Sequence, residues 1–387
     1  MATGGTGAGG PGRARPWWRR PGLGAGLALL LALAFPALVG YSGYYLEIGF
    51  NFFLWAMLGL SLNFILGGTG QYNLGHAAFF AAGAYTTAIL NTRLGVPVLV
   101  LLPVAATVAG VLAAAVARPI VHLRGDYLLI VTVGFAEIVR IALRNDIFGI
   151  TGGSNGILNI DRPELFGFKL SQMVHFYYLS LLFTLITVFI ALRLENSRVG
   201  RAWSYIREDE VAAAAMGIDT GRYKVLAFAV GGALAGAAGN LYAAKMTVIA
   251  PESFSFWESV VMFAIVILGG TGSIPGVFLG TFGMVVLPQL FRALADYRML
   301  VFGAAMVVLM IFRPEGLWPS RRWRLAVRGA EETGAASVAP GGGLPGGPGG
   351  ARTGVAGSDS TGAAAGGPGA GGNAGTGAAA GGAASAG

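Results

Sequence analysis

The sequence predicts an all-α polytopic membrane protein. Three observations support this fold class. Of the 387 residues, 55% are hydrophobic and only 11% are charged, the mean hydropathy is +0.66, and long apolar stretches recur along the chain. An ordinary soluble domain has about 25% charged residues. The composition therefore excludes an ordinary soluble fold and makes lipid the expected solvent of most of the chain.

Residues 1–22 form a basic arm in front of the first apolar run, which covers 23–39. Arginines followed by an apolar run also occur in secretory signal peptides. Many further apolar runs follow this one, and they favour an uncleaved first span. The arginines of the arm are Arg13, Arg15, Arg19 and Arg20.

The membrane domain is expected to cover residues 23–320. A helix that crosses about 30 Å of hydrocarbon needs roughly 20 mostly apolar residues. We expect about ten spans, and no fewer than about eight, because three of the candidate stretches are short and short spans are broken or re-entrant. The stretches are 23–41, 46–66, 74–90, 96–117, 127–143, 173–193, 225–244, 258–268, 275–291 and 299–312.

Basic residues predict the orientation of the spans. They gather before the first stretch, after the fourth, between the sixth and seventh, and after the tenth. The positive-inside rule therefore predicts that both termini lie in the cytoplasm. Because topology accounts for the formal net charge of +8, nucleic-acid binding is not expected.

The last segment, residues 329–387, consists almost entirely of small residues and contains no aromatic residue. Such a segment cannot bury enough apolar surface to offset the entropy lost on ordering. We expect a disordered, Gly/Ala-rich cytoplasmic tail.

The hexapeptide ILGGTG occurs twice, at 65–70 and at 267–272, and each copy closes an apolar stretch. The repeat suggests an internal duplication of the kind that frames the pathway in many transporters. Chance similarity between two tight helical connections is the alternative. Two polar residues of the second copy and its flank, Thr271 and Ser273, are candidate path or gate residues.

The segment at 70–77 has the glycine spacing of a phosphate-binding loop. His76 stands where that loop needs lysine and Ala77 where it needs serine or threonine, so nucleotide binding is not expected. What remains is a polar break that contains Gln71, Asn73 and His76. Polar groups are costly in lipid unless they face a partner or a cavity, so these residues serve either helix packing or a translocation path.

Glu137 and Arg140 lie three residues apart inside the fifth stretch, so they share one helix face and can form an ion pair. The pair could line a path or relay protons, or it could lock two helices together. No second acid–base partner lies nearby in the sequence.

The loop at 194–224 predicts a short cytoplasmic helix at Ser204–Met216, ended by Gly217. Such a helix is marginal alone and needs a surface to pack against. Its acidic residues fit poorly with an anionic leaflet, so we expect it to dock on another protein rather than lie on lipid. The apolar strip consists of Ile206, Val211, Ala214 and Ala215, and the charges are Arg207, Glu208, Asp209 and Glu210.

The sequence contains few residues of the kinds that catalyse reactions or bind metal ions. The chain has no cysteine and only three scattered histidines, and it contains no metalloprotease motif. Neither a catalytic centre nor a metal site is expected.

Several separated blocks, taken together and in order, are similar to the permease subunits of branched-chain amino acid ABC importers, specifically the longer of their two related permeases. The resemblance covers about 46–317. The blocks are GLSLNFILGGTGQYNLGHAAFFAAGAYT (59–86), LRGDYLLIVTVGFAEIVR (123–140), TGGSNGI (151–157), GRAWSYIREDEVAAAAMGID (200–219), PESFSFWES (251–259), ILGGTGSIPG (267–276) and FRPEGL (312–317).

The resemblance implies a multi-pass permease of the bacterial plasma membrane that binds no cofactor of its own. ATP would be used by separate ATP-binding subunits, which contact a coupling helix at 204–217. A second, homologous permease would form part of the path, and an extracytoplasmic solute-binding protein would deliver the substrate to the loop at 145–172. The coupling residues would be Ile206, Arg207, Glu208, Glu210, Ala214 and Gly217.

The implied substrates are leucine, isoleucine and valine, with urea or short amides as the alternative on the same scaffold. A secondary carrier is a further alternative, in which Glu137 and Arg140 would couple transport to an ion gradient. An intramembrane enzyme is the weakest alternative, because no base for catalysis is evident.

Overall fold

A computed structural model describes residues 21–123, 125–146, 149–165, 168–290, 303 and 316–318. Nearly all of the predicted N-terminal arm at 1–22 lies outside these residues. So do the apolar stretch at 299–312, apart from one residue, and the whole predicted tail at 329–387.

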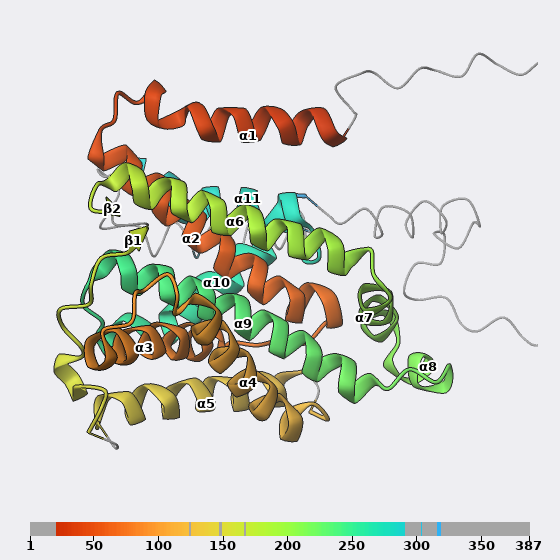
Figure 1. Cartoon of the computed structure of the whole chain (residues 1–387). Coiled ribbons are helices and arrows are strands. Elements are labelled where there is room, and N and C mark those ends of the chain that lie inside the picture. Colours follow the sequence, from red (N-terminus) through yellow and green to blue (C-terminus); the bar gives the residue numbers. More distant parts are fainter. Residues whose placement is uncertain are drawn as a thin grey trace, which may run out of the picture. The chain divides into compact units, whose positions relative to one another are not determined.

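The described residues are predominantly helical, which confirms the all-α prediction (Figure 1). The two strands, β1 (Glu164–Leu165) and β2 (Phe168–Lys169), form one short antiparallel pair. Two π-helical segments, η2 (Phe64–Gly68) and η5 (Phe282–Val286), extend α2 and join α11 to α12. Two short 3₁₀ segments are η3 (Gly153–Asn155) and η4 (Pro251–Phe254). The α-helices are α1 (Pro21–Leu38), α2 (Gly43–Asn63), α3 (His76–Leu94), α4 (Leu102–Ile120), α5 (Asp126–Arg144), α6 (Met173–Glu195), α7 (Arg198–Glu208), α8 (Glu210–Ala215), α9 (Thr220–Met246), α10 (Phe256–Gly269), α11 (Ile274–Thr281) and α12 (Leu287–Leu290).

Among the described residues, 5 helical segments are long and apolar enough to cross a membrane. Shorter apolar helices cover Gly26–Leu38 and Ile274–Gln289. Helices α3 and α5, of 19 residues each, are not in this set. About ten spans and two cytoplasmic termini stay predictions. The segments are Gly43–Gly68, Leu102–Ile120, Met173–Glu195, Thr220–Met246 and Pro251–Gly269.

A seam of small residues joins α4 to α9. Four alanines of α4 follow one another at every fourth position and are fully buried. A Cβ added at Gly232 or Gly236 of α9 would collide with this row of alanines. Lipid provides no hydrophobic drive between helices, so close backbone approach through small residues is the main source of packing energy. The two glycines therefore serve helix packing. The alanines are Ala105, Ala109, Ala113 and Ala117.

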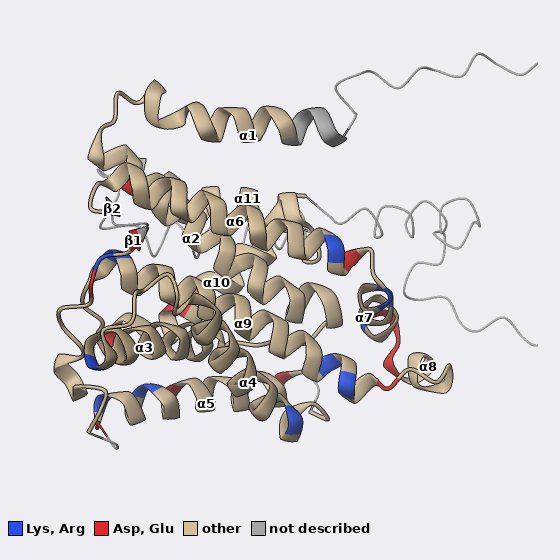
Figure 2. Ribbon diagram, viewed as in Figure 1, with Lys and Arg blue, Asp and Glu red and all other residues tan. Residues whose placement is uncertain are grey.

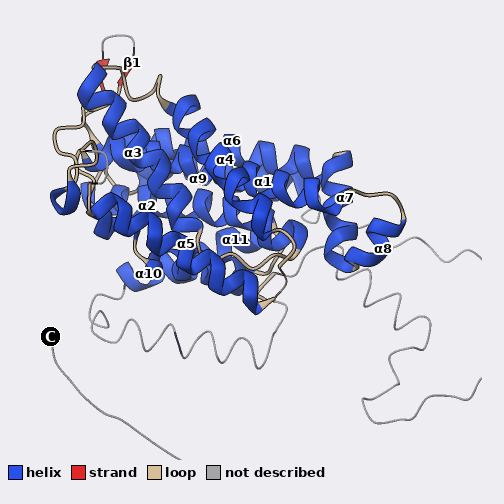
Figure 3. Ribbon diagram, turned by 90° about the horizontal axis from the view of Figure 1, so that it is seen from below, coloured by secondary structure: helices blue, strands red, loops and turns tan. Residues whose placement is uncertain are grey.

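The two ends of the helical bundle differ in what they carry. Figure 1 and Figure 3 show α7 and α8 at one end and the β1–β2 pair at the other. Figure 2 shows that charged residues gather mostly near the helix ends, whereas α5 also carries them within its length. We call these the α7–α8 end and the β1–β2 end.

Loops at the β1–β2 end are held by hydrogen bonds between distant segments. Ile157 and Ile249 exchange backbone hydrogen bonds of 2.9 and 3.0 Å, and the Ile160 amide donates to the Thr247 carbonyl at 3.0 Å. Asp146 accepts from the Thr151 amide at 2.7 Å and from its hydroxyl at 2.8 Å. The amide and hydroxyl of Thr151 hold the pKa of the Asp146 carboxyl below its usual range. The segment at 149–165 is therefore tied to the loop that follows α9.

We expect Gly236→Val to destabilise the bundle by at least about 1–3 kcal/mol, because the added side chain meets the Ala109 side chain and the Ala105 carbonyl. Gly26→Val on α1, where nothing lies within 4 Å, is the matched control. Thermal unfolding of both variants in detergent measures the difference. Equal midpoints would contradict the role of the seam.

Candidate functional site

The segment between α6 and α9 folds into two helices in place of the one continuous helix expected over Ser204–Met216. Asp209 has an extended backbone (φ −153°, ψ 109°), and its carboxylate accepts from the Val211 and Ala212 amides at 2.8 and 3.0 Å. An aspartate N-cap begins a new helix, so α7 ends at Glu208 and α8 starts at Glu210. The sequence contains this signal, an aspartate in front of EVAAAA.

Gly217 ends α8 as predicted. Its φ is +83°, a conformation that side-chain-bearing residues rarely adopt, and its amide donates to the Ala214 carbonyl at 2.9 Å.

Two buried side chains fasten α7 and α8 to the bundle. The Trp203 indole donates to the Tyr223 carbonyl at 2.8 Å and packs edge-on against Phe64. The Lys224 ammonium donates to a Glu210 carboxylate oxygen at 2.5 Å and to the Val121 carbonyl at 3.4 Å. A buried ammonium is costly unless it is paired, so these contacts fix the position of α8 relative to α4 and α9.

Exposed apolar side chains lie on α8 and at one position of α7, next to the exposed charged residues Arg207, Glu208 and Asp209. Val211 and Met216 are 67% and 66% exposed. Ile206 packs inward instead, so only the other three members of the predicted strip, Val211, Ala214 and Ala215, face outward. Exposed apolar patches on otherwise packed proteins mark interaction surfaces. We call Tyr205, Val211, Ala212, Ala214, Ala215 and Met216 the α7–α8 face.

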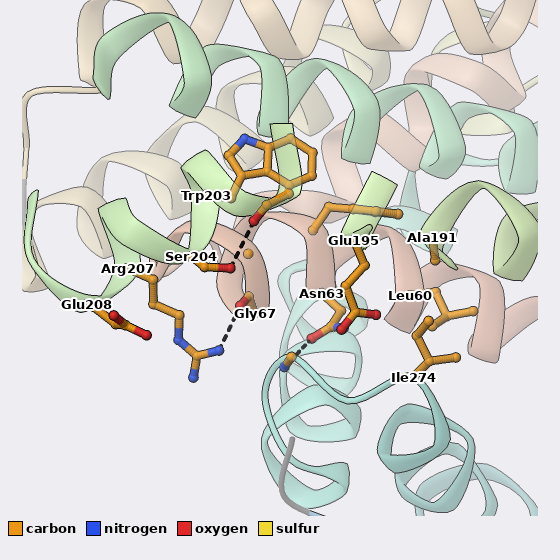
Figure 4. A pocket seen from close by; sticks show the side chains of 14 residues that line it. Leu60, Asn63, Gly67, Ala191, Glu195, Trp203, Ser204, Arg207, Glu208 and Ile274 are labelled. Carbon is orange, nitrogen blue, oxygen red and sulfur yellow. Dashed lines mark hydrogen bonds between the residues drawn. The ribbon is translucent and has the colours of Figure 1, made fainter. Parts of the chain in front are cut away.

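Arg207 joins the two copies of ILGGTG. Its guanidinium donates to the Gly67 carbonyl at 2.7 Å (Figure 4). It also donates to the Thr271 hydroxyl at 2.8 Å. The Asn63 side chain, two residues before the first copy, accepts from the Gly272 amide at 2.9 Å. The hexapeptides therefore lie side by side, although they are far apart in the chain. We call the two hydrogen bonds of Arg207 the Arg207 brace.

The two hexapeptides share one backbone feature and differ in another. Gly70 and Gly272, the last residues of the copies, have φ values of +73° and +78°. Gly68 is helical within η2, whereas the corresponding Gly270 has a φ of +111°. The copies thus end in similar turns from different helix termini, and the internal duplication stays a prediction.

A cavity of about 400 Å³ lies beside the Arg207 brace (Figure 4). Its wall mixes apolar side chains such as Leu60 and Ile274 with polar groups from α6 and α7, among them Glu195 and Ser204.

His76 and Asn73 lie in a fully buried hydrogen-bond network. The Ser61 hydroxyl donates to the Leu58 carbonyl at 2.7 Å, so its 2.7 Å contact with His76 Nε2 requires His76 to donate. His76 Nδ1 then faces the Asn73 amide nitrogen at 3.4 Å, and Asn73 Oδ1 accepts from the Gly75 amide at 2.9 Å. This arrangement favours the helix-packing alternative, because it uses the polar atoms of both side chains.

The other candidate path residues are dispersed. The Gln71 side-chain amide is buried and has no hydrogen-bond partner in the part of the chain that the structure describes. The Ser273 hydroxyl accepts from the Gly276 amide at 3.2 Å and caps α11. Glu137 and Arg140 form the predicted ion pair on α5, with Arg140 Nε donating to Glu137 Oε2 at 3.0 Å. The described residues contain no cluster of His, Cys, Asp or Glu side chains that could hold a metal ion.

Comparison with known proteins adds to this geometry. Residues 44–310 match the family model described as branched-chain amino acid transport system, permease component. The chain belongs to this permease family. The matched range contains α3 to α12 and all of α2 except its first residue, and with them the Arg207 brace, the α7–α8 face and the ion pair of α5.

Curated relatives of the permease agree with the family match. The chain is 38% identical to the high-affinity branched-chain amino acid transport system permease protein LivM of Salmonella typhimurium, covering 79% of this chain and 77% of the relative. It is 39% identical to LivM of Escherichia coli, with 78% and 75% covered. The permease protein LivH of Salmonella typhimurium is 26% identical, with 68% and 90% covered. No solved structure gives a significant match. The resemblance found in the sequence is confirmed.

We expect Lys224→Met to loosen α8, because it removes the hydrogen bonds to Glu210 and Val121. Hydrogen–deuterium exchange of the backbone at 209–217 should rise about tenfold. Arg222→Met, which removes an exposed ion pair with Asp219, is the control and should leave this exchange unchanged. Unchanged exchange in both variants would show that Lys224 does not hold α8.

Proposed function

We propose that this chain is a permease subunit of an ATP-binding cassette importer for branched-chain amino acids in the bacterial plasma membrane. The observation that carries the proposal is the similarity to LivM, at 38% and 39% identity over most of the chain. The helical segments of span length support a membrane location. In this function the chain supplies part of a translocation path and has no catalytic site of its own.

The α7–α8 face is proposed as the docking surface for the ATP-binding subunit. It is apolar, exposed and carried at one end of the bundle, and Lys224 and Trp203 hold it in a fixed position. A rigid, solvent-facing apolar patch is suited to a groove on a soluble partner. ATP is used by that partner, and this chain binds no cofactor.

The topology proposed with this function has about ten spans within 23–320 and both termini in the cytoplasm. The basic residues near α7 and the docking role both favour the α7–α8 end as the cytoplasmic end. The β1–β2 end then faces outward and receives the solute-binding protein at 145–172. The arm at 1–22 and the tail at 329–387 would lie in the cytoplasm.

The Arg207 brace suggests how docking reaches the membrane domain. Arg207 belongs to the docking element, whereas Gly67 and Thr271 lie at the ends of two membrane helices, η2 after α2 and the turn after α10. A displacement of α7 therefore acts on both helix ends through one guanidinium. Arg207 is a positioning residue in this proposal, rather than a docking contact.

The proposed function is tested by reconstituting the chain in liposomes with its neighbouring ATP-binding subunits, second permease and solute-binding protein. Leucine, isoleucine or valine should stimulate ATP hydrolysis and accumulate inside. Stimulation by urea or acetamide instead would assign the alternative substrates. Uptake driven by an ion gradient without ATP would refute the proposal.

We expect Val211→Asp and Met216→Asp each to lower capture of the ATP-binding subunit at least about tenfold, because each places a charge in an apolar contact. Co-purification from membranes measures capture. Leu158→Asp, at an exposed apolar position near the other end of the bundle, is the control. Capture at the wild-type level by both α8 variants would contradict the docking surface.

We expect Arg207→Met to retain the ATP-binding subunit but to lower uptake per ATP hydrolysed at least about tenfold. Methionine keeps the apolar stem and removes both hydrogen bonds of the brace. Thr271→Val removes one acceptor, and a double variant no worse than Arg207→Met would show that the two residues act through one contact.

Arg201→Met is the matched control for the brace, because this arginine lies on the same helix and its guanidinium donates only to the nearby Asn196 carbonyl among the hydrogen bonds described. A normal ratio of uptake to ATP hydrolysis in Arg207→Met would refute the coupling role.

A further inference from the structure

The outward faces of α4, α5 and α6 are not alike. Between their terminal turns, α4 and α6 expose apolar side chains and no charged ones, as expected for helices that face lipid tails. The exposed Thr107 hydroxyl on α4 donates to the Pro103 carbonyl of its own helix. α5 exposes apolar side chains as well, but Glu137 and Arg140 stand among them, 41% and 22% exposed. The exposed apolar residues are Val104, Val108 and Val111 on α4, Tyr127, Ile130, Val131, Ile138 and Ile141 on α5, and Leu182, Leu185, Ile186 and Phe189 on α6.

Contact with lipid would be energetically unfavourable for the outer face of α5. Glu137 lies seven residues before Arg144, the last residue of the helix, which is roughly 10 Å along the axis. A charged side chain at such depth is expensive in hydrocarbon, and membrane proteins keep such groups against protein or water. The ion pair lowers this cost without removing it, because both side chains keep exposed surface.

The inner side of α5 packs against other segments of this chain. Leu128, Thr132 and Ala136 form one buried stripe, and the Thr132 hydroxyl accepts from the Leu74 amide at 3.2 Å. A Cβ added at Gly75 would collide with the Thr132 carbonyl, so α5 and the connection before α3 touch through their backbones. The outer face is therefore the side that α5 offers to another molecule.

Related permeases occur in pairs. Salmonella typhimurium has both a LivM and a LivH protein, each similar to this chain, and so does Escherichia coli. LivH of Salmonella typhimurium is matched over 90% of its length. A partner with the same arrangement of helices is thus available in these systems, whereas a lone permease would leave the charges of α5 against lipid.

We propose that the outer face of α5 is the surface on which the second permease packs, and that Glu137 and Arg140 line the route between the two chains. This inference rests on the proposed function. An amino acid in water is a zwitterion, with one ammonium and one carboxylate group. Glu137 and Arg140 offer one countercharge for each group within a single helical turn. The apolar residues beside them would form the contact with the partner.

Cross-linking tests the interface in the assembled transporter. Because the chain has no cysteine, a single introduced thiol can carry a benzophenone photo-cross-linker without background from this subunit. The native side chains Ile138 on α5 and Phe189 on α6 are 67% and 63% exposed, so Ile138→Cys and Phe189→Cys form a matched pair of labelling positions. We expect Ile138→Cys to cross-link to the second permease at least about tenfold more than Phe189→Cys. Equal yields, or cross-linking by Phe189→Cys alone, would overturn the interface.

Neutralising the ion pair tests the route. If Glu137 and Arg140 only lock α5, the double variant Glu137→Gln/Arg140→Gln should transport normally, because an uncharged pair leaves no unpaired charge. We expect uptake to fall at least about tenfold while the second permease and the ATP-binding subunit still co-purify. Normal uptake would refute the route.

A second variant decides the question if the double variant does not assemble. Ile141→Cys lies one turn from Glu137 on the exposed side of α5. A membrane-impermeant charged thiol reagent should modify it in the assembled transporter and block uptake, and excess substrate should slow the modification. No modification would refute the route. Failure of the wild-type transporter to import any amino acid would refute the proposed function instead. The cross-linking result would still decide whether the second permease packs on α5.

Discussion

The close approach of α4 and α9 is the contact on which the remaining arrangement depends. It is possible only because alanine faces glycine at successive turns, so the two backbones meet without intervening side chains. This approach brings the end of α4 near the start of α9, where Lys224 can reach both the Val121 carbonyl and Glu210. The position of α8 is thus set by small residues deep in the bundle, far from the surface that it presents.

Much of the fold could be predicted from the sequence, because lipid imposes simple rules on length and polarity. The apolar runs at 46–66, 96–117, 173–193 and 225–244 overlap helices of span length in the structure. Gly217 could be predicted as a helix end, since its role depends on local backbone conformation alone. The ion pair of Glu137 and Arg140 followed from their spacing on one helix.

What could not be predicted depends on contacts between distant segments. The inward direction of Ile206 depends on how α7 packs on the bundle, which helix periodicity does not specify. In the Arg207 brace, the partners Gly67 and Thr271 lie 140 and 64 positions from Arg207 in the sequence. The residues around Arg207 in the sequence do not indicate these partners. The break at Asp209 was missed for another reason. An N-cap contributes only about 1 kcal/mol, which is comparable to the helix propensity of the residues on either side.

Helix α9 is long enough to connect the two ends of the bundle directly. Its 27 residues form one helix roughly 40 Å long. Tyr223 and Lys224, the fourth and fifth residues of α9, hold α7 and α8. The Thr247 carbonyl, just past the last turn, accepts from the Ile160 amide at the opposite end. A single helix that is hydrogen-bonded at both ends can transmit a displacement from one end to the other without a series of intermediate rearrangements. A push delivered to α8 would therefore reach the loops of the β1–β2 end as a tilt or slide of a single rod.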